Sequence, residues 1–510
     1  MLDNLLLCAL VQLPVQYVTD ATTDTVVRLS DLNADDDYND AGEVTQVYVD
    51  TVGAFALGNN IGLRSSVDGS VYVTDSSEDC VFLFRDHNND GDANDPDEHV
   101  RWLDGRAGGN ASGILMPAAN GLVQGADGVM WVASANSGTT GVDSVLRLTD
   151  VNGDGDANDL GEAVEWWSRP GSPTGDSVPQ AVQIGLDGAI YLLDAPSSAG
   201  FSKGVYRIAD NNLDGDGNDA GETAPYFIPP FTVTPFFWCL EIDTLGWFYT
   251  ADTGNERVWK FKDLNADGDA QDAGESFLYW SVGAASNIWD LSVSASGDVY
   301  CSDNQTTSRV IRLRDADGSN SIGATEVTTV YDEVLASIII GNGRGMDFGP
   351  SIPAGTPFCF GDGLGVPCPC ASNGQPGKGC PNSVSIGGAR LWTIGNASIA
   401  ADTLVLDARF MPNSSALYFQ GTGQLNNGFG NAFGDGLRCA GGSVTRLGTK
   451  VNAAGQSRFP AVGDQSVSVR GACTAGQTRT YQVWYRNADP AFCTASTFNL
   501  TNGVQVFWTP

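Results

Sequence analysis

Apolar and polar residues alternate along most of the first 350 residues, in short runs rich in β-branched and aromatic side chains. Alternation with a period of two is typical of β-strands that bury one face, and no stretch keeps a helical period. Turn residues, chiefly Gly, Asn and Asp, separate the runs. The pattern therefore predicts an all-β protein built from many short antiparallel strands.

One arrangement of strands recurs six times along these residues. Each copy has an aromatic-centred strand, a short turn, a second strand that ends in Arg or Lys, any residue and Asp, then an acidic loop and a third strand. The acidic loops begin at Asp31, Asp86, Asp150, Asp210, Asp263 and Asp315. A period of about 50 to 65 residues with four strands is typical of a propeller blade with an enlarged loop. We therefore predict a six-bladed β-propeller over residues 14–350.

The ends of the repeat region predict how the ring closes. The first copy lacks a clear inner strand, whereas an unassigned strand at Gly345-Met-Asp-Phe-Gly-Pro350 follows the sixth copy. We expect this strand to complete the blade that the N-terminus begins, because closure removes an exposed sheet edge. The strand pattern resembles six-bladed propellers of the NHL and related families. That resemblance is architectural and implies no particular activity.

The acidic loops carry the strongest chemical motif, seen most clearly in Asp150-Val-Asn-Gly-Asp-Gly-Asp-Ala-Asn-Asp-Leu-Gly-Glu162. Oxygen side chains alternate along the loop, and Gly155 allows a tight turn. Alternate residues that point at one centre supply the hard oxygen ligands that Ca²⁺ prefers, whereas Mg²⁺ demands a smaller octahedral cage. The loop resembles the calcium loops of EF-hand, dockerin and thrombospondin type 3 modules. Strands rather than helices flank it, so EF-hand switching is not implied.

Five loops keep one spacing, and we expect about five Ca²⁺ per chain, each acting as a structural staple of its blade. The sixth loop, at Asp315, is shortened. The expected ligands are Asp31, Asn33, Asp35, Asp37, Asp40, Glu43, Asp86, Asn88, Asp90, Asp92, Asp95, Glu98, Asp150, Asn152, Asp154, Asp156, Asp159, Glu162, Asp210, Asn212, Asp214, Asp216, Asp219, Glu222, Asp263, Asn265, Asp267, Asp269, Asp272 and Glu275.

Charge divides the chain into two parts. The net charge is −35, and nearly all acidic residues lie before residue 351, whereas residues 351–510 have a small basic excess. So acidic a first part repels nucleic acid and anionic membranes, which makes cations its natural partners. The charge boundary coincides with a Pro- and Gly-rich stretch. We therefore expect a Pro/Gly/Cys-rich linker at residues 351–382 and a separate domain after it.

The second domain, residues 383–510, reads as a small β-sandwich or jelly roll. Its motifs Phe358-CFGDG, Asn431-AFGDGLRCAGG, Tyr481-QVWYRN and Phe492-CTASTFNLTNG resemble a C-terminal module of large secreted proteins of planctomycetes and similar bacteria. The resemblance covers about 150 residues and implies an extracellular, surface-associated role.

Cysteine usage also favours an oxidising compartment, because seven of the eleven cysteines follow residue 358. The disulfide candidates are Cys359, Cys368, Cys370, Cys380, Cys439 and Cys493. Cys439 and Cys493 are plausible partners, the four-cysteine cluster has room for two internal bonds, and Cys473 is left over. Zinc is disfavoured, because Cys368 and Cys370 are spaced Cys-x-Cys with no second pair and no His nearby.

The first thirteen residues read as a weak signal peptide or as an apolar N-terminal strand. No stretch of the chain approaches the length of apolar residues that spans a membrane. These features together predict a secreted protein of the cell surface or matrix.

Three functions remain open at this stage. We expect first a calcium-stapled structural or adhesive protein, not an enzyme, that self-assembles into a fibre or layer if the N-terminal apolar strand is donated to a neighbour. The second is a propeller that recognises carbohydrate or protein through exposed aromatic residues such as Trp131, Trp166 and Trp167.

The third function is a metal-dependent lactonase or hydrolase of the central channel, with Glu241, Asp290 and Asp347 near the inner strands. The only histidines, His87 and His99, lie in or beside the second acidic loop, so a His-based catalytic site elsewhere is excluded. Aspartates of the strand motif, namely Asp75, Asp194, Asp252 and Asp303, are expected to cap blade turns.

Overall fold

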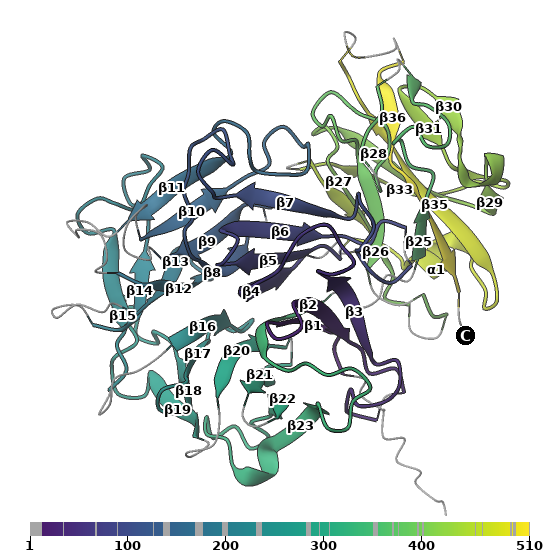
Figure 1. Ribbon diagram of the computed structural model, residues 1–510. Helices are drawn as coiled ribbons and strands as arrows, with labels where there is room; N and C mark the ends of the chain where they lie inside the picture. The colour runs from purple at the N-terminus through teal and green to yellow at the C-terminus, as the bar shows by residue number, and fades with distance from the viewer. Residues whose placement is uncertain are drawn as a thin grey trace, which may run out of the picture.

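The computed structural model describes most of the 510 residues (Figure 1). The residues not described are 1–12, 34, 67–68, 89, 126, 136–142, 169–176, 196–201, 231–236, 282–286, 295, 305–306, 350–354, 370–371, 376, 395–396, 400–401, 454, 462, 490–491, 493–495 and 509–510. The prediction for residues 1–13 therefore lies outside the described residues except for Leu13, which is buried.

Six four-stranded antiparallel sheets occupy the described part of residues 14–349. We call them blades 1 to 6 in chain order, and each is given from its innermost strand outward. They are β24 (Gly343–Phe348), β1 (Gln16–Asp20), β2 (Thr25–Leu29) and β3 (Val44–Val49); β4 (Asn60–Ser65), β5 (Val71–Asp75), β6 (Cys80–Phe84) and β7 (His99–Asp104); β8 (Ala119–Gln124), β9 (Met130–Ser134), β10 (Ser144–Leu148) and β11 (Ala163–Ser168); β12 (Pro179–Ile184), β13 (Ile190–Asp194), β14 (Gly204–Ile208) and β15 (Thr223–Phe227); β16 (Phe237–Ile242), β17 (Phe248–Asp252), β18 (Arg257–Phe261) and β19 (Ser276–Ser281); and β20 (Ile288–Val293), β21 (Val299–Asn304), β22 (Ser308–Leu313) and β23 (Val327–Asp332), which a short 3-10 turn, η1 (Ala324–Glu326), precedes.

The innermost strands form a closed ring around a central axis. Each one contacts the innermost strand of the next blade, and β24 contacts both β20 and β4. β24 also pairs with β1, so the strand that follows the sixth repeat completes blade 1, as the sequence predicts. This ring defines a β-propeller, which confirms the expected fold class.

Glycine residues allow the inner strands to approach one another closely. A Cβ atom on Gly345 of β24 would lie 2.7 Å from Ile61 O and 2.7 Å from Leu63 N of β4. Gly62 and Gly121 have backbone atoms of the next blade equally near. Because no side chain fits in these spaces, the ring is narrow at the level of these glycines.

Hydrophobic residues are buried mainly between neighbouring blades. One cluster joins Tyr48 of blade 1 to Val73 and Phe82 of blade 2, and another joins Phe227 of blade 4 to Phe248 of blade 5. Face-to-face packing of twisted sheets explains why both faces of each blade are apolar.

The C-terminal part consists of further strands arranged in two larger sheets. The first sheet contains β25 (Gly355–Phe358), β37 (Gly503–Phe507), β35 (Thr478–Arg486), β28 (Ser415–Gly421) and β33 (Thr445–Val451), with β36 (Phe498–Leu500) beside β35; the second contains β26 (Arg390–Ile394), β27 (Val405–Arg409) and β34 (Ser457–Phe459). Smaller elements are the pairs β29 (Gly423–Gln424) with β32 (Ala440–Gly441) and β30 (Asn431–Phe433) with β31 (Gly436–Arg438), the 3-10 turn η3 (Asn426–Gly428) and the helix α1 (Val467–Gly471).

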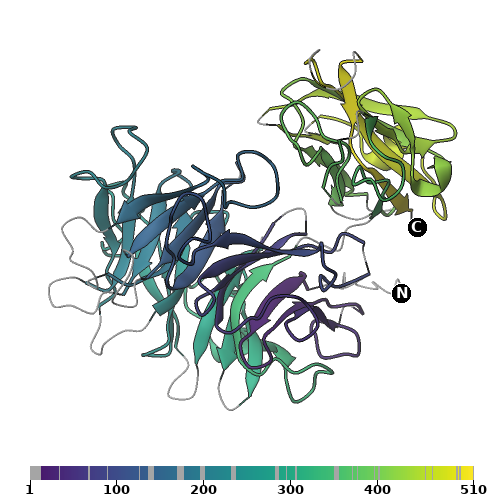
Figure 2. The same ribbon diagram turned by 45° about the horizontal axis from the view of Figure 1, so that its top comes forward.

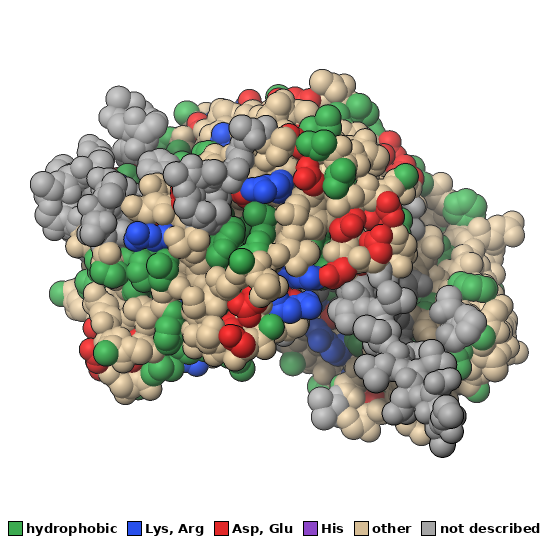
Figure 3. All heavy atoms as spheres, turned by 90° about the horizontal axis from the view of Figure 1, so that it is seen from below, with side chains coloured by type: hydrophobic (Ala, Val, Ile, Leu, Met, Phe, Trp, Pro, Cys, Tyr) green, Lys and Arg blue, Asp and Glu red, His purple; other side chains and the backbone are tan. Residues whose placement is uncertain are grey.

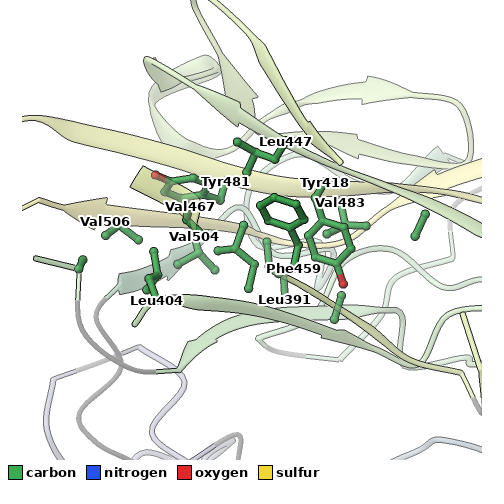
Figure 4. Packing of buried hydrophobic residues seen from close by; sticks show 14 of the residues in the cluster. Leu391, Leu404, Tyr418, Leu447, Phe459, Val467, Tyr481, Val483, Val504 and Val506 are labelled. Carbon is green, nitrogen blue, oxygen red and sulfur yellow. The ribbon is translucent and has the colours of Figure 1, made fainter. Parts of the chain in front are cut away.

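One apolar core lies between these two sheets. Tyr418, Tyr481 and Val483 of the first sheet pack against Leu391 and Phe459 of the second (Figure 4). The two-layer packing agrees with the β-sandwich that alternating apolar residues predict.

The segment expected to be a linker takes part in this second domain. β25, at Gly355–Phe358, pairs with β37, and Cys359 is bonded to Cys439. A second disulfide joins Cys368 to Cys380. The described part of residues 355–382 thus belongs structurally with the strands that follow it. The C-terminal part lies beside blades 2 and 3 (Figure 2), where Gly155 of the third acidic loop approaches Gln375.

The disulfides correct one expectation. Cys439 pairs with Cys359 and not with Cys493, because β25 joins the sheet next to β37 and brings Cys359 to the start of β32. Cys370 and Cys493 lie outside the described residues. Cys473 is a buried free thiol, in agreement with the expectation that it is left over from the disulfide pairs. The two bonds indicate an oxidising, extracellular location.

No helix among the described residues is long and apolar enough to cross a membrane.

Candidate functional site

A small cavity lies on the propeller axis, and residues of all six innermost strands line it. Its volume is about 30 Å³, which is enough for about one or two water molecules. All of the lining residues lie on strands and none on the loops between them. Instead, each blade contributes between one and four residues from its inner strand, so the ring fixes their positions.

A buried ion pair forms the polar centre of the cavity. Arg64 of β4 donates from Nη2 to Glu241 Oε1 of β16 at 2.6 Å, and its Nη1 lies 3.5 Å from Asp347 Oδ1 of β24. Gln183 Nε2 of β12 donates to Glu241 Oε2 at 3.1 Å. Burial raises the pKa of Glu241 above its ordinary value, although the adjacent guanidinium of Arg64 opposes this effect. Four blades therefore meet in one charged network.

Asp290 of β20 is the second carboxyl group of the cavity. Its Oδ1 accepts the Leu291 N–H at 2.8 Å, and its Oδ2 accepts the Met346 N–H at 2.7 Å. Burial raises the pKa of Asp290 well above its usual range, and the nearby charge of Glu241 adds to this effect. Asp290 is consequently the carboxyl group of the cavity that retains a proton most readily.

Aromatic and cationic side chains form another part of the cavity wall. The rings of Trp238 and Trp289 stack with centroids 4.8 Å apart, and the Arg344 guanidinium lies 4.5 Å from the Trp289 centroid. Trp289 Nε1 and Arg344 Nε are buried, and neither donates to an acceptor among the described residues. Buried donors without an acceptor cost about 1–3 kcal/mol each. The wall therefore offers two N–H groups to an oxygen atom of a bound molecule.

A divalent metal ion does not fit these channel residues. The positive charge between Glu241 and Asp347 is already that of Arg64. Both oxygens of Asp290 accept backbone N–H groups. A metal ion would have to displace Arg64 from both of its partners. The channel therefore does not provide the metal site that the sequence-based hypothesis of a metal-dependent lactonase requires.

The acidic loops lie away from the axis, on the connections between the third and fourth strands of the blades. In the third loop, Asp150 Oδ2 accepts the Gly155 N–H at 3.0 Å, and Asn152 Nδ2 donates to Asp154 Oδ2 at 3.0 Å and Asp159 Oδ2 at 2.6 Å. Glu162 accepts the backbone N–H groups of Val151 and Asp159. These hydrogen bonds hold the loop in a compact turn.

Three carboxylates converge in four of the loops, with their oxygens within 4.8 Å of one another. These clusters are Asp31, Asp35 and Glu43; Asp86, Asp90 and Glu98; Asp154, Asp156 and Glu162; and Asp315, Asp317 and Glu326. The shortened sixth loop is therefore among them. Separate acidic groups are visible on the face of the molecule in Figure 3.

The remaining two loops differ slightly from these four. The loops at Asp210 and Asp263 keep the bridging amide, with Asn212 Nδ2 donating to Asp214 Oδ2 at 3.0 Å and Asn265 Nδ2 donating to Asp267 Oδ2 at 3.2 Å. In the part of each loop that the structure describes, however, three carboxylates do not come within the same distance.

Glu98, in the second loop, stands out among the final glutamates. It is buried, and its Oε2 atom has no hydrogen-bond partner among the described residues, whereas Oε1 accepts the His87 N–H at 2.7 Å. Burial raises its pKa to about 7. An unpartnered carboxylate oxygen next to Asp86 and Asp90 is placed to accept a cation.

The histidines take no part in the channel. His99 Nδ1 lies 3.0 Å from Ala93 O, and its Nε2 accepts the Ala54 N–H at 3.2 Å. His99 therefore holds the loop connections of blades 1 and 2 together.

The strand-motif aspartates cap turns between blades, as expected. Asp75 is fully buried and accepts the Gly58 N–H at 2.7 Å and the Ser77 N–H at 2.9 Å. Asp194 and Asp303 accept the N–H groups of Val178 and Asn287 in the same way. These carboxylates stabilise backbone turns.

The tryptophans proposed for recognition are core residues. Trp166 and Trp167 are buried between blades 3 and 4. Trp131 packs edge-on against Trp166 at a centroid distance of 4.8 Å. None of the three offers a free aromatic face, so the structure gives no support to recognition through them.

No protein-family model matches the chain, and no curated protein sequence matches it. Among solved structures, virginiamycin B lyase from Staphylococcus aureus is similar at 15% identity and a TM-score of 0.39, over 65% of this chain and 84% of the lyase. A gluconolactonase from Xanthomonas campestris is similar at 16% identity and a TM-score of 0.39, over 62% of this chain and 87% of that enzyme. At these values the similarity concerns the fold.

The comparisons correct our expectation of function. We expected a structural or adhesive protein that is not an enzyme, whereas the named proteins of similar fold are a lyase and a gluconolactonase. This finding contradicts the expectation, which is not retained. The activity proposed below rests on the geometry of the channel and not on these similarities.

Sequence reasoning identified Glu241, Asp290 and Asp347 but missed Arg64, Gln183, Trp289 and Arg344. Arg64 and Glu241 are 177 residues apart in the sequence. The sequence signal that could have identified Arg64 is a charged residue on an innermost strand that faces the axis. It could be interpreted only if the register of all six inner strands were known.

Proposed function

We propose that the protein is a hydrolase of the lactonase type whose acid and base are carboxyl groups of the axial cavity. The observation that carries this proposal is the pair of unpartnered donors, Trp289 Nε1 and Arg344 Nε, in a cavity that also holds Glu241 and Asp290. Donors without acceptors beside two carboxyl groups of raised pKa are the parts needed to hydrolyse an ester bond.

In the proposed reaction, only the carbonyl oxygen of a lactone enters the cavity, which has room for little more than that group and the attacking water, and it accepts hydrogen bonds from Trp289 and Arg344. Glu241 takes a proton from a water molecule, whose oxygen forms a bond to the carbonyl carbon. Asp290 donates its proton to the ring oxygen as the carbon–oxygen bond breaks. The proton on Glu241 then returns to Asp290 through solvent, so the reaction consumes one water and no other reactant.

Arg64 sets the protonation of the two carboxyl groups. Its ion pair keeps Glu241 the more readily ionised of the two, whereas Asp290 has both burial and the charge of Glu241 raising its pKa. Two carboxyl groups whose environments separate their pKa values in this way fit the roles of base and acid.

The test is a turnover assay with a panel of γ- and δ-lactones in a pH-stat. Glu241→Gln and Asp290→Asn should each lower kcat/KM by about a hundredfold or more, the size of a lost general base or acid. Glu165→Gln removes an exposed carboxylate of β11 and should leave kcat/KM unchanged. If no lactone is turned over, or if the variant that combines Glu241→Gln with Asp290→Asn is as active as the wild type, the proposal is wrong.

The acidic loops support a second candidate function, which is calcium binding. The observation in its favour is the convergence of three carboxylates in four loops together with the unpartnered Oε2 of Glu98. We propose that these loops hold Ca²⁺ as staples of the blades, with the Asn amide turned so that its oxygen faces the ion. About five ions per chain remains our prediction.

Native mass spectrometry with and without a chelator tests the calcium proposal. Bound ions should be counted in the calcium form, and the chelator should lower the unfolding temperature of the propeller, because a ligand bound only to the native state stabilises it. Magnesium at the same concentration is the matched control. An equal unfolding temperature with calcium and with chelator would show that the loops fold without an ion.

A further inference from the structure

A groove crosses the outer face of the first C-terminal sheet, on the side away from the core shown in Figure 4. Leu417, Phe419 and Trp484 form its floor, and its volume is about 670 Å³. Alternation along β28 explains the floor: Tyr418 and Gln420 point inward, so Leu417 and Phe419 point outward. A volume of this size lies within the usual range for small-ligand sites.

Aromatic side chains extend the floor toward one edge. Phe433, on the β30–β31 hairpin, is 43% exposed, and its ring lies 5.1 Å from that of Phe498. Trp484 lies 5.5 Å from the same Phe498 ring. The groove therefore presents an apolar floor that is partly buried at Leu417 and Trp484 and exposed at Phe433.

Three arginines surround this apolar floor. Arg438, Arg446 and Arg470 come from β31, β33 and the end of α1, and no Asp or Glu is among the described residues that line the groove. None of the three forms an ion pair with a described carboxylate, although the chain as a whole has a net charge of −35. Residues 351–510 also have a small basic excess, so a groove with three arginines and no described acidic lining residue is suited to an anion.

Two of the arginines are held in place from behind. Arg470 Nε donates to Leu447 O at 2.8 Å, and Arg438 Nε donates to Ala440 O at 3.4 Å. These bonds use the Nε atoms, so the terminal N–H groups of both guanidinium groups remain available to a ligand. Terminal guanidinium pairs bind a carboxylate in a two-pronged manner.

We propose that this groove binds an acidic oligosaccharide, with uronate carboxylates on the arginines and sugar rings on the aromatic floor. Sugar rings have apolar faces that pack on aromatic rings, whereas their hydroxyl groups remain in water, so an open groove suits them. An acidic peptide would satisfy the arginines but would lack stiff, flat apolar faces along the groove. The site is independent of the activity proposed for the axial cavity.

Isothermal titration of the full chain with hexagalacturonate tests the proposal, with cellohexaose as the uncharged probe of equal length and hexaglutamate as the acidic peptide. Hexagalacturonate should bind, and raising the salt concentration should weaken it, because the contacts are charged. Cellohexaose and hexaglutamate should each bind at least tenfold more weakly.

Arg446→Gln with Arg470→Gln is the decisive variant, because both side chains are exposed and are not needed for the core. It should weaken hexagalacturonate binding at least tenfold and leave the unfolding temperature unchanged. Arg458→Gln, an exposed arginine of β34 on the other sheet, makes the same kind of charge change away from the groove and should not affect binding.

Three results would overturn the proposal. They are equal binding of hexagalacturonate by the wild type and the double variant, binding of cellohexaose as tight as that of the uronate, and binding of hexaglutamate as tight as that of the uronate. A second variant, Phe433→Ala, checks the aromatic floor, because it should weaken the uronate but not a single acetate ion.

Discussion

Replacing Arg64 by Met should destabilise the propeller in a manner that depends strongly on pH. The change removes the positive charge between Glu241 and Asp347, whose side chains are 11% and 14% exposed. Removal of one partner of a buried ion pair costs about 3–5 kcal/mol, because the other charge remains buried and unpaired. We expect a loss of this size at pH 8.

At pH 5 the loss should be much smaller. Burial already raises the pKa of Glu241, and the loss of Arg64 removes the largest effect that opposes this rise. A carboxyl group with a raised folded-state pKa favours the folded state below its unfolded pKa and loses this contribution as pH rises through the folded pKa. Lowering the pH should therefore favour the protonated form of Glu241 in the variant and reduce the loss toward that of the missing hydrogen bonds, about 1 kcal/mol.

Differential scanning calorimetry at pH 5 and pH 8 measures the effect. With about 2 °C per kcal/mol for a large domain, the unfolding temperature should fall by about 6–10 °C at pH 8 and about 2 °C at pH 5. The double variant Arg64→Met with Glu241→Gln should recover most of the loss at pH 8. Arg106→Met, which breaks an exposed pair with Asp104, should change little at either pH. An equal loss at both pH values, or no recovery in the double variant, would refute the reasoning.

Three further outcomes follow from the packing. Gly345→Ala should lower the unfolding temperature of the propeller by an amount equivalent to about 1–3 kcal/mol, because the new Cβ has no space between β24 and β4, whereas Gly323→Ala should be neutral in the same calorimetric scan. Cys359→Ser with Cys439→Ser should destabilise the C-terminal domain by about 2–5 kcal/mol in denaturant titrations and leave the propeller transition unchanged. Asp75→Asn should cost about 1–3 kcal/mol in thermal unfolding, because the buried carboxylate accepts several turn N–H groups.

The blade architecture could be predicted from the sequence because each blade is local. The strands of a blade follow one another within one repeat, and the alternation of apolar residues sets which face is buried. Ring closure by β24 also left a local trace, since one strand was missing at the beginning and one was in excess at the end. The position of the acidic loops within the blades could be predicted for the same reason, because Asp150 and Glu162 belong to one short segment.

The axial cavity could be predicted only in part, because it assembles residues from every repeat. Glu241 and Asp290 stood out as acids on apolar inner strands, but Arg64 became meaningful only when closure placed β4 opposite β16. The prediction of the disulfide partner of Cys439 was wrong for a similar reason. The Cys359–Cys439 bond depends on the pairing of β25 with β37. Contacts between distant segments leave no spacing signal in a single sequence.

The two groups of carboxylates differ in what the surrounding protein supplies. At the edges of the blades, acidic side chains face one another across short loops, and the charge that would balance them has to come from solution. At the axis, Arg64 supplies that charge from within the chain, and the low polarity of the ring raises the pKa values of Glu241 and Asp290. The axis combines carboxyl groups of raised pKa with positions that six strands fix, which suits the acid–base chemistry that we propose there. The loop carboxylates converge on one another instead, and this convergence is the basis of our calcium proposal.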